Sequence, residues 1–471
     1  MIRFVKRLYK SDPVLVTVVM LLMLFSLLLI YSSTGRLAQV ERGGNMWYYF
    51  LRHLALSVLA LVAMGGMKFF SWRWLYQRVG WLLLAAAGLV MIAAFGGQNI
   101  NGAGRWITVP GLGVTFQPSE LAKIVIVLYV AKLLSDYQVE HECLPEVLRY
   151  FWPPIVLIGL IFLDNFSTSA LVAVVCLVLC WVGRVKLRLL AKWFGVAAGA
   201  LAFLILLGIA FPKIKDAGRI GTIIGRFTAF FTPSDRSDNS KNYNYQSDQA
   251  HIAVALGQVT GCGPGNSVQR NFLPHPYSDF VYAIIIEEYG LVGGVIVLLL
   301  YSIILVRVGA IAQKTLKAGY LNSRGGPDIF PALVVIGLGF SLVLQAIFHM
   351  GVNVGVFPVT GQTLPLVSMG GTSLVFVGAA LGIILNIAYS FSPEGLAEEA
   401  EKQKNAAGLF VKKRMVASKR ERTERVFTEP VPMPEEDFDL PGDDLRGFEE
   451  EFEQEGRREL EELGRRGRRG M

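Results

Sequence analysis

Long apolar runs recur along the first 390 positions of this chain and limit what it can fold into. Each run has about 18 to 25 apolar residues, enough for a helix to cross a hydrocarbon core of roughly 30 Å. Hydrophobic residues make up 53% of the 471-residue chain and charged residues only 17%, which is too apolar for an ordinary soluble protein. The runs therefore predict an all-α integral membrane protein. A transmembrane β-barrel would show short alternating strands instead.

We predict ten membrane-spanning helices, with a large extracytoplasmic loop between the seventh and the eighth. They lie near residues 14–34, 47–67, 76–95, 119–134, 150–164, 167–183, 190–211, 280–308, 329–350 and 372–391. Lys and Arg gather before the first span and in the connections 184–192 and 309–328, which the positive-inside rule places in the cytoplasm. Both termini are then cytoplasmic. A cleaved signal peptide is the competing interpretation of the N-terminus, but no A-x-A site follows its long apolar part.

The composition changes after Ser392, where basic and acidic blocks replace the apolar runs. We therefore divide the chain into a membrane domain, 1–391, and a charged cytoplasmic tail, 392–471. The tail has too little apolar material to build a core and is expected to be disordered. Its basic half could contact anionic lipid, or it could simply be solvated.

The segment "NGAGRWITVPGLGVTFQPSELAK" (101–123) is too rich in Gly and Pro to be a bare lipid-facing helix. We expect an external loop that enters a helix at Pro118. Glu120 and Lys123 are three residues apart and can pair on that helix, or one of them can face a substrate cavity. Arg105, next to Trp106, could bind a phosphate through two hydrogen bonds or anchor the chain at the membrane surface.

The segment "NFLPHPYSDFVYAIIIEEYGLVGG" (271–294) carries three acids where an apolar span begins. Asp279 lies at the N-terminal end of the predicted helix, where it could be an N-cap or a functional group. On a continuous helix Glu287 lies about 12 Å deeper and Glu288 lies nearly opposite Asp279. The three acids are therefore not expected to share a site. Glu287 could line a deeper wall of the same cavity or take part in an ion pair, and Glu288 is expected to pair with a neighbouring helix.

Four further segments are unusually polar or glycine-rich for their position. In "LDNFSTSA" (163–170), Ser and Thr are expected to cap the returning helix. Residues 249–258 predict a short amphipathic helix, and "GCGPGNS" (261–267) predicts a turn that could cradle an anion. The uncharged but polar segment 349–375 is expected to be buried or to line a polar cavity, and we hypothesise that it lies near Asp279.

Four segments together resemble the SEDS (shape, elongation, division and sporulation) family, which includes FtsW and RodA. They are "NGAGRWI…FQPSELAK", "YQSDQAHIAVALGQVTGCGPGNS", "LPHPYSDFVYAIIIEEYGLVG" and "NVGVFPVTGQTLPLVSMGGTS". The resemblance implies a peptidoglycan glycosyltransferase that polymerises lipid II at the outer face of the bacterial cytoplasmic membrane, in cell division or elongation. It also implies a class B penicillin-binding protein as partner, together with other divisome or elongasome proteins. The "LPHPYSDF" form and the charged tail favour an FtsW-like over a RodA-like member.

The resemblance also implies roles for individual residues. The family's essential aspartate falls on Asp279, which becomes the candidate catalytic base. Candidate substrate contacts lie within the resembling segments, and they are Arg105, Glu120, Lys123, Gln249, Ser278, Thr363 and Ser368. One departure stands at Asp164 and Asn165, where the family's acid is displaced by one position, so no role is carried over to them.

The expected chemistry joins two lipid-linked disaccharides. Asp279 would take the proton of the acceptor hydroxyl, and Arg105, Lys123 or a divalent cation could stabilise the departing diphosphate. No cofactor is otherwise expected, no Cys/His spacing predicts a metal site, and no nucleic-acid partner is expected. Two rival functions use the same features: a flippase for lipid II, and a non-catalytic scaffold for a penicillin-binding protein.

Overall fold

The computed structural model describes residues 10–96, 98–100, 103–108, 115–139, 150–193, 238–318 and 328–398, with a few isolated positions besides. The chain divides into two units, Met1–Ala400 and Glu401–Met471. Apart from Glu401, the described residues belong to the first unit. The predicted disorder of the tail lies largely outside the described residues and stays a prediction.

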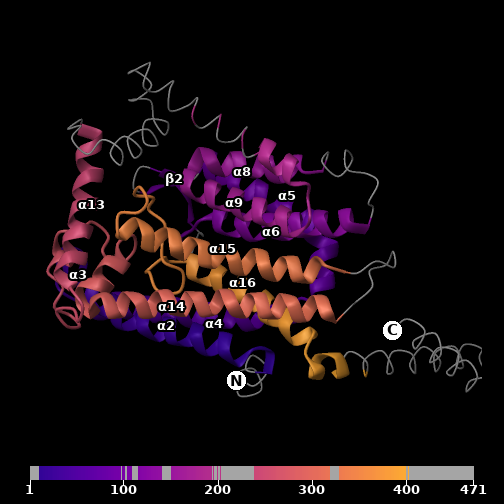
Figure 1. The fold of residues 1–471 in the computed structure, drawn as a ribbon. Helices are drawn as coiled ribbons and strands as arrows, with labels where there is room; N and C mark the ends of the chain where they lie inside the picture. The colour runs from indigo at the N-terminus through magenta and orange to yellow at the C-terminus, as the bar shows by residue number, and fades with distance from the viewer. Residues whose placement is uncertain are drawn as a thin grey trace, which may run out of the picture. The chain divides into compact units, whose positions relative to one another are not determined.

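The first unit is a bundle of long helices that run side by side (Figure 1). Its helices are α2 (Pro13–Ser33), α3 (Gly35–Arg42), α4 (Met46–Gly66), α5 (Trp72–Gly96), α6 (Pro118–Val139), α8 (Trp152–Asp164), α9 (Phe166–Val182), α13 (Asp238–Gly257), α14 (Val281–Lys317), α15 (Phe330–Asn353) and α16 (Ser373–Ser390). The described residues also include two short 3-10 helices, η1 (Met67–Phe69) and η2 (Gln269–Asn271). A small antiparallel sheet contains β1 (Gln98–Ile100), β2 (Ala103–Thr108) and β3 (Thr115–Phe116) in that order.

The helical membrane class is confirmed, whereas the number of spans stays a prediction. Among the described residues, six helices are long and apolar enough to cross a membrane: α2, α4 extended through η1, α5, α14, α15 and α16. Two apolar helices, α8 and α9, are shorter. The predicted fourth span corresponds to α6, which carries several charges, and most of the predicted span 190–211 lies outside the described residues.

Small residues bring helices α16 and α4 into close contact. Gly378 and Gly382 are four residues apart, as in the GxxxG pattern of membrane helix pairs. A Cβ at Gly378 would lie 2.4 Å from the carbonyl oxygen of Ala60, and one at Gly382 would lie 2.2 Å from that of Met64. The two backbones therefore pack with no room for a side chain between them.

Helix α14 is broken at Gly290, where φ is 70° and ψ is −175°. Segment 258–263 fills the break: the amide of Cys262 donates to the carbonyl of Glu287 at 2.9 Å, and the amide of Leu291 donates to that of Gln258 at 2.9 Å. Residues 281–289 therefore form a short helix at one end of the bundle. The part after the break is about 40 Å long, which is enough to cross a bilayer.

Candidate active site

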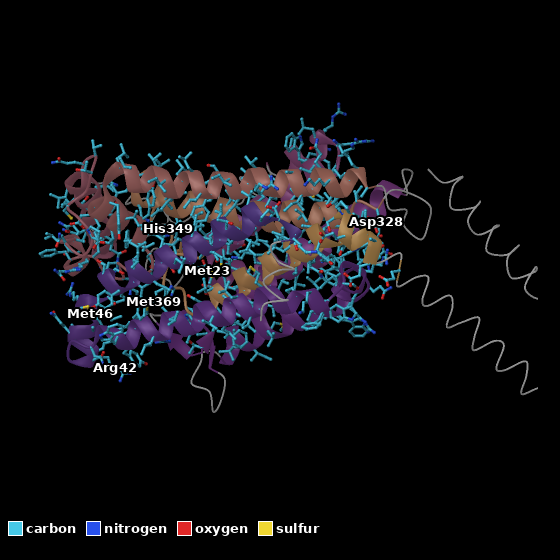
Figure 2. The ribbon with its side chains drawn as sticks, turned by 90° about the horizontal axis from the view of Figure 1, so that it is seen from below. Met23, Arg42, Met46, Asp328, His349 and Met369 are labelled. Carbon is cyan, nitrogen blue, oxygen red and sulfur yellow. The ribbon has the colours of Figure 1, made fainter. Side chains whose placement is uncertain are left out.

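A polar cavity of about 300 Å³ lies among helix ends and loops of the first unit. Its lining comes from α4, β2, β3, the start of α6, the α8–α9 turn and the loops before α14 and α16. The polar and charged residues of the lining are Arg52, His53, Trp106, Thr115, Gln117, Glu120, Asn165, Thr168, His275, Tyr277, Ser278, Asp279, Gln362, Thr363 and Ser373. Met369, also in the lining, lies at the same end of the bundle as Arg42 and Met46 and opposite to Asp328 (Figure 2).

Asp279 lies in this lining, just before α14 begins. The N-cap position belongs to Phe280, which makes no side-chain capping bond, so Asp279 is not the N-cap residue. The hydroxyl of Ser278 donates to Asp279 Oδ1 at 2.9 Å, and Asn353 Nδ2 donates to the backbone carbonyl of Asp279 at 3.2 Å. These bonds hold a half-buried carboxylate at the wall of a polar cavity.

The hypothesis that the segment 349–375 lies near Asp279 is confirmed. The hydroxyl of Ser368 donates to the carbonyl of Ser278 at 2.7 Å, and the amide of Met369 donates to the carbonyl of Tyr277 at 2.9 Å. Thr363 lines the cavity itself, whereas Ser368 is buried behind it and holds the two loops together.

Glu120 and Lys123 form a buried ion pair on α6, with 2.9 Å between Lys123 Nζ and Glu120 Oε2. Lys123 also donates to Gln345 Oε1 at 2.8 Å, and Gln345 Nε2 donates to the carbonyl of Thr363 at 2.9 Å. Glu120 lines the cavity, while Lys123 lies beside a separate small pocket of about 20 Å³. Glu120 therefore both forms the predicted ion pair and faces the cavity, whereas Lys123 lies behind the cavity wall.

Four of the seven predicted substrate contacts are absent from the described lining: Lys123 and Ser368, which lie behind it, and Arg105 and Gln249. Arg105 lies in β2, but its side chain is outside the described part of the structure, although its neighbour Trp106 lines the cavity. Gln249 lies on α13, outside the lining. That helix extends over Asp238–Gly257, so the predicted boundaries 249–258 were too short.

The sequence interpretation missed Arg52 and His53, two lining residues from α4. Arg52 is the one Lys or Arg in the lining among the described residues. His53 is 1% exposed, its Nε2 lies 3.0 Å from Ser26 Oγ, and its Nδ1 has no hydrogen-bond partner among the described residues. The Arg–His pair inside the apolar run 46–66 could have identified them, because polar groups in membrane helices face protein or water-filled cavities.

Glu287 and Glu288 belong to a different structure from Asp279. The Glu287 carboxylate accepts hydrogen bonds from Ser267 Oγ at 2.5 Å and from the amides of Val268 and Gln269 at 2.8 and 3.1 Å. It does not line the cavity, so the predicted wall role is wrong. The glycine-rich turn 261–267 donates hydrogen bonds to this internal carboxylate and to backbone carbonyls of α14. The prediction that it cradles a ligand anion is therefore not supported.

Glu288 pairs with a neighbouring helix, as predicted. The hydroxyl of Ser32, at the end of α2, donates to Glu288 Oε1. Arg270 Nη1 donates to the carbonyl of Ser32 at 2.9 Å, which ties the loop before α14 to the same point. Glu288 therefore fastens α14 to α2 and takes no part in the cavity.

The turn "LDNFSTSA" is capped by Asn165 and not by its Ser or Thr. The Asn165 side chain accepts a hydrogen bond from the amide of Thr168 at 3.2 Å, which is the N-cap bond of α9. Asn165 and Thr168 also line the cavity, and Gln362 Nε2 donates to Thr168 Oγ1 at 3.0 Å. The side chain of Asp164 lies outside the described residues.

Tyr277 borders Asp279 and keeps a neutral hydroxyl. Burial, followed by the nearby charges of Glu41 and Asp279, raises the pKa of Tyr277 to about 12. Its hydroxyl oxygen lies 3.2 Å from His275 Nδ1, and His275 adopts a left-handed φ of 59°. The cavity therefore presents an uncharged hydroxyl next to its aspartate.

Among the described residues, no three His, Cys, Asp or Glu side chains gather as a metal site. The acids of the cavity lining are Glu120, which pairs with Lys123, and Asp279. These residues do not by themselves form a ligand set for a resident divalent ion.

The helices and the cavity define a multi-pass membrane protein with a polar site at one end of its bundle. The chain belongs to the FtsW/RodA/SpoVE family of cell cycle proteins, whose model matches residues 12–392. This confirms the family resemblance.

Relatives and solved structures agree with this assignment. The chain is 33% identical to the probable peptidoglycan glycosyltransferase FtsW of Thiomicrospira cyclica, over 80% of this chain and 92% of that protein. It is 29% identical to the stage V sporulation protein E of Bacillus subtilis, over 80% and 96%. A peptidoglycan synthase complex that coordinates polymerization and crosslinking contains a similar chain, with 25% identity, a TM-score of 0.60 and coverage of 81% and 98%. The relatives named FtsW support the FtsW-like prediction.

The fold is also that of RodA from Thermus thermophilus. The TM-score is 0.54 at 24% identity, with coverage of 80% of this chain and 96% of that chain. At this identity the likeness concerns the fold alone, and it agrees with a helical membrane domain.

Proposed function

We propose that this chain is a peptidoglycan glycosyltransferase that polymerises lipid II into glycan strands. The observation that carries the proposal is the polar cavity that brings Asp279 and Arg52 into one lining at an end of a membrane bundle. A base and a cation in one site are what glycosyl transfer from a lipid diphosphate needs. The names of the FtsW relatives support the same activity.

The reaction is a single displacement at the anomeric carbon of the donor. The acceptor is the 4-hydroxyl of a second lipid-linked disaccharide, and Asp279 takes its proton as the oxygen attacks C1. The bond from C1 to the lipid diphosphate breaks, and the diphosphate leaves with the electron pair. Attack from the face opposite to the leaving group inverts the anomeric centre. A positioned general base contributes about 10²- to 10⁴-fold to such a step.

The other lining residues bind and orient the reactants. Arg52 provides two parallel N–H donors for the departing diphosphate, and Arg105, on the strand beside Trp106, is a second candidate for this role. Ser278, Thr363 and Gln362 offer hydroxyl and amide groups to the sugars. A divalent cation that arrives with the diphosphate would add to this charge stabilisation.

The protein acts at the outer face of the bacterial cytoplasmic membrane, with both termini in the cytoplasm, as the positive-inside pattern predicts. Its partner is a class B penicillin-binding protein, which supplies crosslinking, alongside other divisome proteins. The similar chain in a synthase complex that joins polymerization to crosslinking supports this partnership.

The test is a polymerisation assay with purified protein and lipid II in detergent, alone and with the cognate penicillin-binding protein. A catalyst makes glycan polymer without a second compartment, whereas a flippase makes none. A scaffold makes none either, and its function would be lost on removal of residues 396–471. Absence of polymer under both conditions would contradict the proposed activity.

A further inference from the structure

A second and larger cavity, of about 700 Å³, lies beside the catalytic one. The two cavities share His275 and Tyr277, which form the wall between them. The remaining lining of the larger cavity comes from the end of α2, from α3, from α13 and from the loop 270–276. Helices α3 and α13 lie together at one end of the bundle (Figure 1).

The lining of this larger cavity is cationic and amphipathic. It contains Arg36 and Arg270 and, among the described residues, no acid. Apolar side chains border it, and Val40 is 77% exposed while Phe272 is 51% exposed. Arginines in one lining with exposed apolar side chains match a ligand that has an anionic head group and a lipid tail.

The two arginines are held in place by backbone carbonyls. Arg36 Nη1 donates to the carbonyl of Asn271, and Arg270 Nη1 donates to that of Ser32 at 2.9 Å. A guanidinium has five N–H donors, so each can hold an anion as well. The arginines are therefore oriented before a ligand arrives, which lowers the entropy lost on binding.

The reaction itself calls for a second binding site. Both reactants are lipid-linked disaccharides, so the acceptor carries a diphosphate of its own, which does not leave. Ligand pockets have volumes of about 300 to 1,000 Å³, so the catalytic cavity, at the low end, is too small for the head groups of both reactants. A second diphosphate needs its own cations, and the neighbouring cavity, which shares a wall with the catalytic one, has them.

We propose that the larger cavity is the acceptor site and that Arg36 and Arg270 bind the acceptor's diphosphate. The acceptor sugar then reaches past Tyr277 to Asp279, while the donor occupies the smaller cavity with its diphosphate at Arg52. The proposal rests on the glycosyltransferase function given above and adds where each of the two reactants binds.

A single-coupling assay separates the two sites. The donor is lipid II with a methyl group on its terminal 4-hydroxyl, so it cannot accept. The acceptor is a lipid II analogue whose anomeric oxygen is replaced by a methylene group, so it cannot donate. The product is one lipid-linked tetrasaccharide, and the apparent KM of each reactant is measured with the other in excess.

Arg36→Ala is expected to raise the KM of the acceptor about tenfold and to leave that of the donor within twofold, because one charged hydrogen-bonding group is lost. Val40→Trp, which fills the cavity and keeps Arg36, is expected to raise the same KM. Arg42→Ala is the matched control: it lies on the same helix, over the ring of Tyr48 at 4.4 Å and outside both linings, and is expected to change neither KM.

The proposal is overturned if Arg36→Ala and Val40→Trp both leave the acceptor KM within twofold, or if they raise the donor KM instead. If the wild type makes no tetrasaccharide, the glycosyltransferase function itself is contradicted. Direct binding of the non-donating analogue to the protein in nanodiscs is measured in parallel. About tenfold weaker binding by Arg36→Ala supports the cavity as its site, and equal binding contradicts it.

Discussion

Asp279 and Glu287 are eight residues apart, yet they occupy opposite kinds of environment. Asp279 is half-buried at the wall of a polar cavity, one residue before the N-cap of α14. Glu287 is 1% exposed and accepts three hydrogen bonds from the loop 267–269. A carboxylate whose acceptor positions are used by its own chain stabilises the fold. One that lies at a cavity wall remains accessible to a substrate.

The break at Gly290 accounts for this difference. Because α14 is interrupted there, segment 258–263 can enter and pair with the backbone of residues 287–291. The loop that follows is then fixed by Glu287 and Glu288 and leads directly to Tyr277 and Asp279. The buried acids thus position the loop that carries the proposed base, without touching the cavity.

The largest expected effect is on the reaction rate of Asp279→Asn. Loss of the general base is expected to lower lipid II polymerisation by about 10²- to 10⁴-fold, while the apparent Tm changes little because the amide keeps the size of the side chain. Polymerisation rate and thermal unfolding are measured on the same purified sample. A variant that polymerises at the wild-type rate would refute Asp279 as the base.

The fold class could be predicted from the sequence, because apolar run length is a local property. Local sequence left Asp279 as either an N-cap or a functional group, and the family resemblance made it the candidate base. The pairing of Glu120 with Lys123 followed from their spacing. The role of Glu287 could not be predicted, because it depends on a helix break and on a loop that returns from 20 residues upstream. A helical wheel drawn through Asp279 and Glu287 also assumes one continuous helix, whereas Asp279 precedes α14.

The second prediction concerns the helix break itself. Gly290→Ala is expected to cost on the order of 4 kcal/mol of stability, because φ is +70° and a Cβ would lie 2.1 Å from the carbonyl oxygen of Val259. Gly265→Ala is the matched control, with φ of +81° and nothing within 4 Å of its Cβ. It is expected to cost about 1 kcal/mol. Thermal unfolding in detergent compares them, and equal losses would mean that the close approach at Gly290 is unimportant.

The third prediction is the opposite of the one for Asp279, because a loss of stability is expected with little loss of activity. Glu287→Gln is expected to cost roughly 3 kcal/mol, because it turns an amide NH₂ toward groups that donate hydrogen bonds and removes a charged acceptor. Protein that still folds is expected to keep a polymerisation rate within a few fold of the wild type. The control is Glu394→Gln, a carboxylate about half exposed that pairs with Lys10 at the surface. A stable but inactive Glu287→Gln would place this acid in the chemistry.

The smallest expected effect tests which acid acts on Tyr277. The pKa of Tyr277 is raised to about 12 by burial, then by Glu41 and Asp279, and Glu287 is not among the causes. Since the unfolded chain ionises near pH 10, the contribution of Tyr277 to stability is constant below that pH and is lost between pH 10 and about 12. Tyrosinate absorbance, taken as the difference from Tyr277→Phe, reports the titration of this one group. Its pKa is expected to fall in Asp279→Asn, which lacks a nearby negative charge, and to stay unchanged in Glu287→Gln. A fall in both variants would mean that the two acids share one electrostatic environment and would undo the distinction between them.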